Sequence, residues 1–165
     1  MDFNELLCVS DNVNLKDYFK LYKYVRDNMP NPEWLGTFTK KEIKDILSSG
    51  GKIWLYYDNK NLVCSMLYIP SNQKTLDKRN ANTKASETAS LGPIMVSPNY
   101  VGNRFMSKML EVFNEYSLSK NMKYIFTKAH SDNIYSINNM YKDGYKLIEE
   151  HDSDRGKVSV FLKKL

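Results

Sequence analysis

A strand, a tight turn and a helix follow one another between residues 90 and 110. The strand is apolar, and a polar turn at residues 97–100 and Gly102 lead from it into an amphipathic helix. Such a turn leaves several backbone N–H groups at the helix N-terminus without internal partners, pointing at one spot. The pattern predicts an anion-binding site. The apolar strand residues are Leu91, Ile94, Met95 and Val96.

A second short helix is predicted after a strand over residues 124–127. Asp132 or Asn133 can start this helix, and Gly144 is well placed to end it. Its apolar positions include Met140 and Tyr141. We expect the chain to hold this helix against the end of the central strand, beside the anion-binding turn.

With both helices in place, the chain resembles the GNAT superfamily of N-acetyltransferases. Residues 89–165 match the family pattern well, and the N-terminal half is compatible with it. Residues 96–106 are similar to the family's pyrophosphate loop, whose main-chain amides hold the diphosphate of coenzyme A. The segment keeps Gly102 and departs from the family at Val101, Arg104 and Met106. At this loop, Arg104 can add a charged donor to a phosphate oxygen.

Residues 133–145 are similar to the family's C-terminal motif of asparagine, small residue, tyrosine and glycine-aromatic. The resemblance implies that Asn133 reaches the pantetheine chain, that Ser136 lets the cofactor pass, and that Tyr141 lies further along the same helix side. Gly144 then releases the chain into the next strand, and Tyr145 packs under it. The implied cofactor is acetyl-CoA, held by Ile94, Met95, Val96, Val101, Gly102, Asn103, Arg104, Phe105, Met106, Asn133 and Ser136.

The resemblance implies an enzyme that transfers an acetyl group to a primary amine of a small molecule or peptide by direct attack. Orientation alone can supply roughly 7–11 kcal/mol of the barrier. An amide in residues 94–96 would hold the developing oxyanion, and Tyr141 would protonate the leaving sulfur. For the base, Glu87 and His130 are the candidates, and a water relay or an already neutral amine is the alternative.

Two other functions are compatible with the sequence. The departures at Val101, Arg104 and Met106 motivate a catalytically silent acyl-CoA-binding sensor or interaction module of the same fold. A nucleic-acid-binding protein is a weaker alternative. The acceptor amine stays unidentified, and we expect the first helix, the 30–39 loop with Trp34 and the 70–88 segment to frame it.

The spacing of apolar residues predicts an α/β (α+β) fold. We expect a mixed, mostly antiparallel central sheet of about six to seven strands, with helices on both faces. Strands are predicted over residues 3–9, 52–57, 62–69, 124–127, 145–149 and 158–162. A first helix, capped by Asp11 or Asn14, should end before Pro30, and a Thr39–Glu42 capping box should start a second over residues 40–47. Residues 70–88 are expected to form a long loop or a poorly ordered helix that buries little, and residues 150–157 a charged turn. Asn121 can end the helix after Gly102.

The composition bounds the remaining possibilities. With 165 residues the chain fits a single domain. The net charge of +5 comes from dispersed lysines, which disfavours nucleic acid, and no apolar run reaches membrane-spanning length. Cys8 and Cys64 are expected to be buried free thiols, and no metal site is indicated. We expect a cytoplasmic protein without a membrane partner, and a homodimer is left open.

Overall fold

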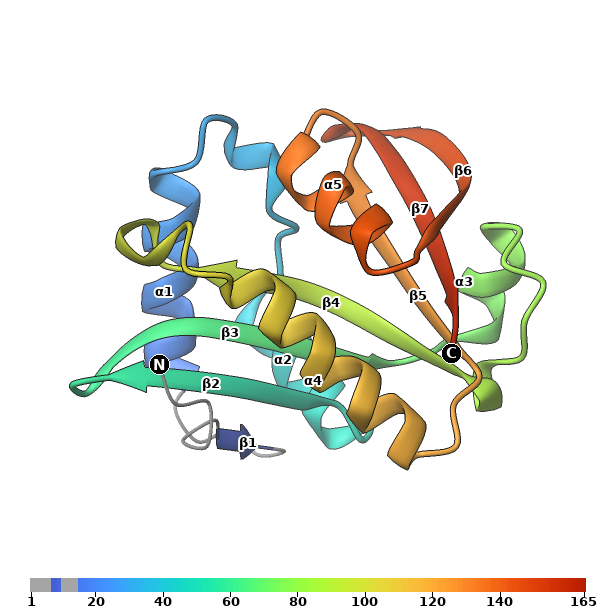
Figure 1. The fold of residues 1–165 in the computed structure, drawn as a ribbon, viewed down its shortest axis with the longest axis horizontal. Helices are drawn as coiled ribbons and strands as arrows, with labels where there is room; N and C mark the ends of the chain where they lie inside the picture. The colour runs from blue at the N-terminus through green and yellow to red at the C-terminus, as the bar shows by residue number, and fades with distance from the viewer. Residues whose placement is uncertain (1–6, 10–14) are drawn as a thin grey trace.

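The computed structural model describes residues 7–9 and 15–165. In these residues a seven-stranded mixed sheet has the strand order β1-β2-β3-β4-β5-β7-β6, and β4 and β5 are its parallel neighbours (Figure 1). The strands are β1 (Leu7–Val9), β2 (Lys52–Asp58), β3 (Asn61–Pro70), β4 (Thr88–Val96), β5 (Tyr124–His130), β6 (Lys146–Ser153) and β7 (Gly156–Lys164). The helices are α1 (Leu15–Asp27), α2 (Lys40–Ser48), α3 (Gln73–Lys78), α4 (Phe105–Ser119) and α5 (Ile134–Lys142). Three single 3₁₀ turns are η2 (Pro32–Trp34), η3 (Ala85–Glu87) and η4 (Pro98–Tyr100).

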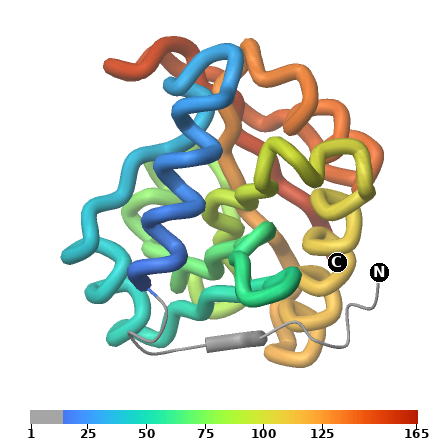
Figure 2. The backbone as a smooth tube through the Cα atoms, turned by 90° about the vertical axis from the view of Figure 1, so that its left-hand side faces the viewer, coloured from blue at the N-terminus to red at the C-terminus, as the bar shows by residue number. Residues whose placement is uncertain are grey.

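Helices cover both faces of the sheet. Figure 2 shows α1 and α2 on one side and α4 on the other, with the strands between them. Each face has its own apolar cluster: Phe105, Met109 and Phe113 of α4 belong to one, and Leu21 of α1 and Ile43 of α2 to the other. The predicted mixed sheet with helices on both faces is therefore confirmed.

Local signals in the N-terminal half act as predicted. The Glu42 amide donates to Thr39 Oγ1 at 3.2 Å and the Thr39 amide to Glu42 Oε2 at 2.6 Å, which completes the capping box of α2. Helix α1 ends at Asp27, before Pro30. The candidate caps at positions 11 and 14, and the first part of the predicted strand 3–9, lie outside the described residues.

Residues 70–88 form a short helix within a mostly exposed segment, in keeping with the prediction of a loop or a helix that buries little. They contain α3, which is capped by Asn72, whose side chain accepts from the Thr75 amide at 3.2 Å. Leu76 and Ala81 are buried beside Phe126 of β5 and form a third apolar cluster. Leu76 is the buried residue of α3, and Ala81 follows the helix.

The prediction of a charged turn over the whole of residues 150–157 is wrong. Glu150 pairs with Ser159 and Asp152 with Lys157, so β6 and β7 continue until a short turn at residues 154–155. The segment is charged because β6 is an edge strand of the described sheet and several of its side chains are exposed. The longer hairpin carries Arg155 toward the loop after α1, where its Nη1 donates to the Glu33 carbonyl oxygen at 3.3 Å.

Candidate active site

The two parallel strands at the centre of the sheet separate halfway along their length. Backbone pairing between β4 and β5 ends at Leu91 and Thr127, and the Thr127 hydroxyl closes it by donating to the Leu91 carbonyl oxygen at 3.0 Å. Beyond this point β4 continues to Val96 and β5 to His130 without pairing. The gap between them opens into a cavity of about 420 Å³.

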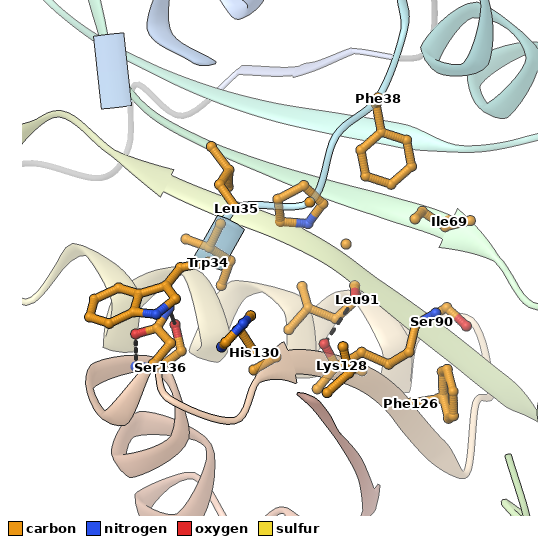
Figure 3. Close-up of a pocket in the computed structure, with 18 of the residues that line it drawn as sticks. Trp34, Leu35, Phe38, Ile69, Ser90, Leu91, Phe126, Lys128, His130 and Ser136 are labelled. Carbon is orange, nitrogen blue, oxygen red and sulfur yellow. Dashed lines mark hydrogen bonds between the residues drawn. The ribbon is translucent and has the colours of Figure 1, made fainter. Parts of the chain in front are cut away.

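The cavity passes through the sheet, so side chains from both faces line it. Met106 of α4 and Asn133, Ser136 and Met140 of α5 form its wall on one face. On the other face, Figure 3 shows Trp34, Phe38, Ile69, Phe126, Lys128 and His130 around the space. A ligand on the α4 and α5 face can therefore meet a ligand from the α1 and α2 face inside the sheet.

The edge of β4 that faces the gap offers free backbone donors. Gly92 and Pro93 interrupt the register between β3 and β4, and a Cβ on Gly92 would lie 3.0 Å from the Leu67 carbonyl oxygen. After this bulge the Ser97 amide donates to the Val63 carbonyl oxygen of β3 at 2.8 Å. Because antiparallel pairs alternate, Met95 also directs its N–H toward β3, whereas the N–H groups of Ile94 and Val96 point toward the gap.

The turn before α4 has the shape expected for an anion-binding site. Gly102 and Arg104 have positive φ of 89° and 61°, and Arg104 occupies the N-cap position. Within the described part of the chain, no backbone acceptor is recorded for the amides of Gly102, Arg104 or Met106. A Cβ on Gly102 would meet nothing within 4 Å, so space remains beside these amides.

The side chains of this turn leave it open. Val101 is 70% exposed, and Asn103 and Arg104 are also exposed, while the Met106 side chain lines the central cavity. Phe105 is buried and packs its ring 5.4 Å from Tyr56, so its side chain anchors the start of α4 in the core. The departures from the family pattern therefore do not fill the turn.

Asn133 and Ser136 lie on the cavity wall, and the side chain of Asn133 caps α5. Its Oδ1 accepts from the Ser136 amide at 3.2 Å, and its Nδ2 donates to Ser136 Oγ at 3.0 Å. Asn133 thus orients the Ser136 hydroxyl so that the Ser136 proton stays available to the cavity. Met140 continues the same helix side and is 4% exposed.

The structure does not place Tyr141 on the cavity wall. Each residue of an α-helix turns about 100°, so seven positions after Asn133 return to the same side and eight overshoot it. Met140 therefore takes the inward position, and Tyr141 is half exposed, with its ring edge-on to Phe161 at 5.6 Å. Tyr141 stands as a surface aromatic, in contrast to its predicted position beside the cofactor.

Glu87 also lies outside the cavity lining. It precedes β4, at the end where β4 and β5 are still paired, and its carboxylate forms an ion pair with Lys123. The hydrogen bond from Lys123 lowers the pKa of Glu87 below its usual value, which makes the carboxylate a weaker base. The structure therefore separates Glu87 from the proposed chemistry.

His130 lines the cavity, but both of its ring nitrogens have partners. Nδ1 accepts from the Asp132 amide at 3.2 Å, which leaves Nε2 protonated to donate to the Arg155 carbonyl oxygen at 2.8 Å. A Cβ on Gly156 would lie 2.7 Å from Nε2, so the β6–β7 turn packs directly on the ring. The imidazole holds this turn in place and is not free to accept a proton from an amine.

The cavity also contains residues that sequence reasoning missed, chiefly Lys128 and Arg155. The Lys128 side chain is exposed at the cavity, and partial desolvation by the surrounding protein lowers its pKa, as do the charges of Arg79, Arg155 and Lys78. Side chains alternate along β5, so Lys128 lies on the same face as Phe126 and His130. This alternation could have identified Lys128 from the sequence. Trp34, which was predicted to frame the acceptor, is in the wall and lies 6.3 Å from the Tyr135 ring.

Solved structures supply the comparison that decides the fold. The ribosomal-protein-S18-alanine N-acetyltransferase from Escherichia coli superposes with a TM-score of 0.71 at 10% identity, covering 96% of this chain and 93% of that one. A GNAT-family acetyltransferase from Streptococcus pneumoniae gives 0.69 at 14% identity, with 98% and 100% covered. The spermidine N-acetyltransferase from Vibrio cholerae, as a point mutant, gives 0.68 at 13%, with 96% and 94% covered. The chain has the GNAT fold.

No protein-family model and no curated protein sequence matches the chain. The GNAT fold is therefore visible in the arrangement of the backbone, while the sequence has diverged from these structures to 10–14% identity. Among the residues that the structure describes, none of the helices is both long and apolar enough to cross a bilayer.

The residues present fit the cosubstrate that the GNAT resemblance implies. The donor set at the start of α4 consists of main-chain amides, and the exposed side chain of Arg104 belongs to the same turn, which suits a diphosphate. The open side of Gly102 leaves room for phosphate oxygens, and Met106, Ser136 and Met140 form a narrow, mostly apolar wall toward the gap in the sheet.

Proposed function

We propose that this GNAT-fold protein transfers an acetyl group from acetyl-CoA to a primary amine. One observation carries the proposal: where β4 and β5 are unpaired, a single cavity passes through the sheet and is lined both from the α4 and α5 face and from the α1 face. A thioester and an amine can approach this gap from opposite faces. Such placement of the two reactants can supply roughly 7–11 kcal/mol of the barrier.

The two ends of the cosubstrate would be held by backbone groups. Amides of Gly102, Arg104 and Met106 would bind the diphosphate, with the Arg104 side chain as an additional donor. The N–H groups of Ile94 and Val96 point into the gap, where they can hydrogen-bond a thioester carbonyl oxygen. Donors fixed in a strand stabilise the charge that develops on this oxygen without reorganising.

Proton transfer would use few side chains. Thioester chemistry supplies an activated acetyl group: the amine nitrogen bonds to the carbonyl carbon, the carbon–sulfur bond breaks, and its electron pair goes to sulfur. The Ser136 hydroxyl, oriented by Asn133, borders the cavity and can donate a hydrogen bond to that sulfur. Since no carboxylate of the described residues lines the cavity, the amine would enter in its neutral form. After the attack its nitrogen would lose one proton to water, and the leaving thiolate would take one proton from water, which gives the amide and free coenzyme A.

Two measurements test this function. Calorimetry should detect saturable binding of acetyl-CoA, and a thiol-release assay over a panel of primary amines should detect free coenzyme A, with mass spectrometry confirming one added acetyl group on the amine. Absence of binding at millimolar acetyl-CoA would refute the proposal. Binding without thiol release for any amine would support the silent binding module instead.

A further inference from the structure

The acceptor side of the cavity combines apolar walls with positive charge. Its apolar residues come from the loop after α1, from β3 and from β5: Met29, Trp34, Leu35, Phe38, Ile69 and Phe126. Lys128 and Arg155 are the charged residues of the lining, and no aspartate or glutamate of the described chain joins them. A polyamine such as spermidine would therefore meet like charge in this space.

These two cations have no carboxylate partner in the part of the chain that the structure describes. Arg155 donates from Nη1 to the backbone carbonyl of Glu33, and no ion pair is recorded for Lys128. The neighbouring Arg79 is already paired with Glu149 at 3.0 Å, with side chains 18% and 15% exposed. Lys128 is exposed at the cavity, and partial desolvation together with the surrounding positive charges lowers its pKa, so an anion beside it would stabilise its charged form.

The diphosphate of the cosubstrate does not account for this charge. In β5, Ile125 and Thr127 lie level with Ala89 and Leu91 of β4, which belong to the face covered by α4. Lys128 alternates to the opposite face, whereas the anion-binding turn begins α4. Lys128 and Arg155 are therefore placed to bind the acceptor amine and not the cosubstrate.

We propose that the acceptor is a small primary amine that carries an anionic group, a carboxylate or a phosphate, on an apolar body. This inference rests on the proposed acetyl transfer. Lys128 and Arg155 bind the anion, Trp34 and Phe126 contact the apolar body, and the amine is thereby directed toward the gap between β4 and β5.

The test uses pairs of amines that differ only in the anion. Phenylalanine is compared with phenylalaninamide, and O-phosphoethanolamine with ethanolamine, and spermidine represents the cationic class. Values of kcat/KM are measured by thiol release, and binding of each amine is measured in the presence of coenzyme A by calorimetry. The first pair tests a carboxylate and the second a phosphate, and we expect at least one anionic member to exceed its neutral partner about 10-fold or more.

The second part of the experiment removes the charge of Lys128. Lys128→Gln should reduce kcat/KM and affinity for the preferred anionic amine about 10-fold and leave its neutral partner within about twofold. Lys44→Gln, an exposed lysine on α2, is the control and should change neither member. Calorimetry with acetyl-CoA confirms that both variants keep the cosubstrate site.

The outcomes separate the inference from the function on which it rests. If acetyl-CoA does not bind to the wild-type chain, the proposed function itself is overturned. If acetyl-CoA binds and the neutral or cationic amines are bound or acetylated as well as the anionic ones, the anionic acceptor is wrong. The same conclusion follows if no anionic amine binds at ~10 mM, well above the usual KM range, or if Lys128→Gln reduces both members of a pair equally.

Discussion

Arg104 is held in a conformation that favours glycine, and its replacement should change stability and cofactor affinity in opposite directions. Its φ of 61° and ψ of 18° are left-handed, a region that costs an L-residue about 1–2 kcal/mol. Glycine avoids this cost, but its greater conformational freedom in the unfolded state offsets about 0.5–1 kcal/mol of the gain in stability. Arg104→Gly should therefore raise the free energy of unfolding by up to about 1 kcal/mol, or Tm by about 2–4 °C.

The same substitution removes a guanidinium that we place at the diphosphate. Hydrogen bonds to charged groups contribute about 1.5–3 kcal/mol, and the exposure of Arg104 puts it at the lower end of this range. The Kd for coenzyme A should therefore rise about 10-fold. Thermal unfolding without ligand and calorimetric titration with coenzyme A measure the two effects separately.

A matched control lies at the other end of α4. Asn121 follows this helix with φ of 58°, so Asn121→Gly relieves a similar strain far along the helix from the turn. It should not change the Kd for coenzyme A. If Arg104→Gly stabilises the protein and binds coenzyme A as tightly as the wild type, the guanidinium does not contact the diphosphate. A loss of stability would refute the strain argument.

Three further substitutions test other parts of the account. Gly156→Ala and Gly50→Ala each introduce a Cβ at a positive φ, of 104° and 101°, but only the Cβ at position 156 would collide with His130, at 2.7 Å. Thermal unfolding should therefore show that Gly156→Ala lowers the free energy of unfolding by about 1–3 kcal/mol more than Gly50→Ala does. Equal losses of stability would contradict the contact between Gly156 and His130. Tyr141→Phe should leave kcat within about twofold of the wild-type value, because the Tyr141 ring lies outside the cavity. Loss of a general acid usually lowers kcat about 10²–10⁴-fold, and a loss of that size would show that Tyr141 donates the proton to sulfur. Glu87→Gln should lower stability at neutral pH and should not alter the pH profile of kcat. Because the folded pKa of Glu87 is lowered, wild type and variant should converge as the pH falls below 4.5 through the lowered value, and a stability difference that persists in acid would argue against the ion pair.

Local signals in the sequence predicted most of the elements that position the site. The Thr39–Glu42 capping box, Gly102 before α4 and Gly144 after α5 all act through the conformation of a few neighbouring residues. Such features depend on short-range sterics and hydrogen bonds, so they can be predicted without knowledge of the fold. The conformation of the turn before α4 belongs to this group.

The parts that the sequence did not predict depend on register or on distant neighbours. A shift of one position on α5 separates Met140, which faces the cavity, from Tyr141, which does not. Glu87 is near the central strand in the sequence, yet it lies at the end of β4 where pairing with β5 is intact. Lys128 and Arg155 are brought together only because β5 and β7 pair over their whole length and β6 and β7 extend to a tight turn.

A crystal structure with acetyl-CoA is the most direct test of the central claim that the cosubstrate and the amine meet in the opened sheet. The account predicts the diphosphate at the amides of Gly102, Arg104 and Met106, and the thioester carbonyl oxygen at the N–H of Ile94 or Val96, with the acetyl group facing the cavity that Trp34 lines. A diphosphate bound elsewhere, or a thioester that does not reach the gap between β4 and β5, would contradict it.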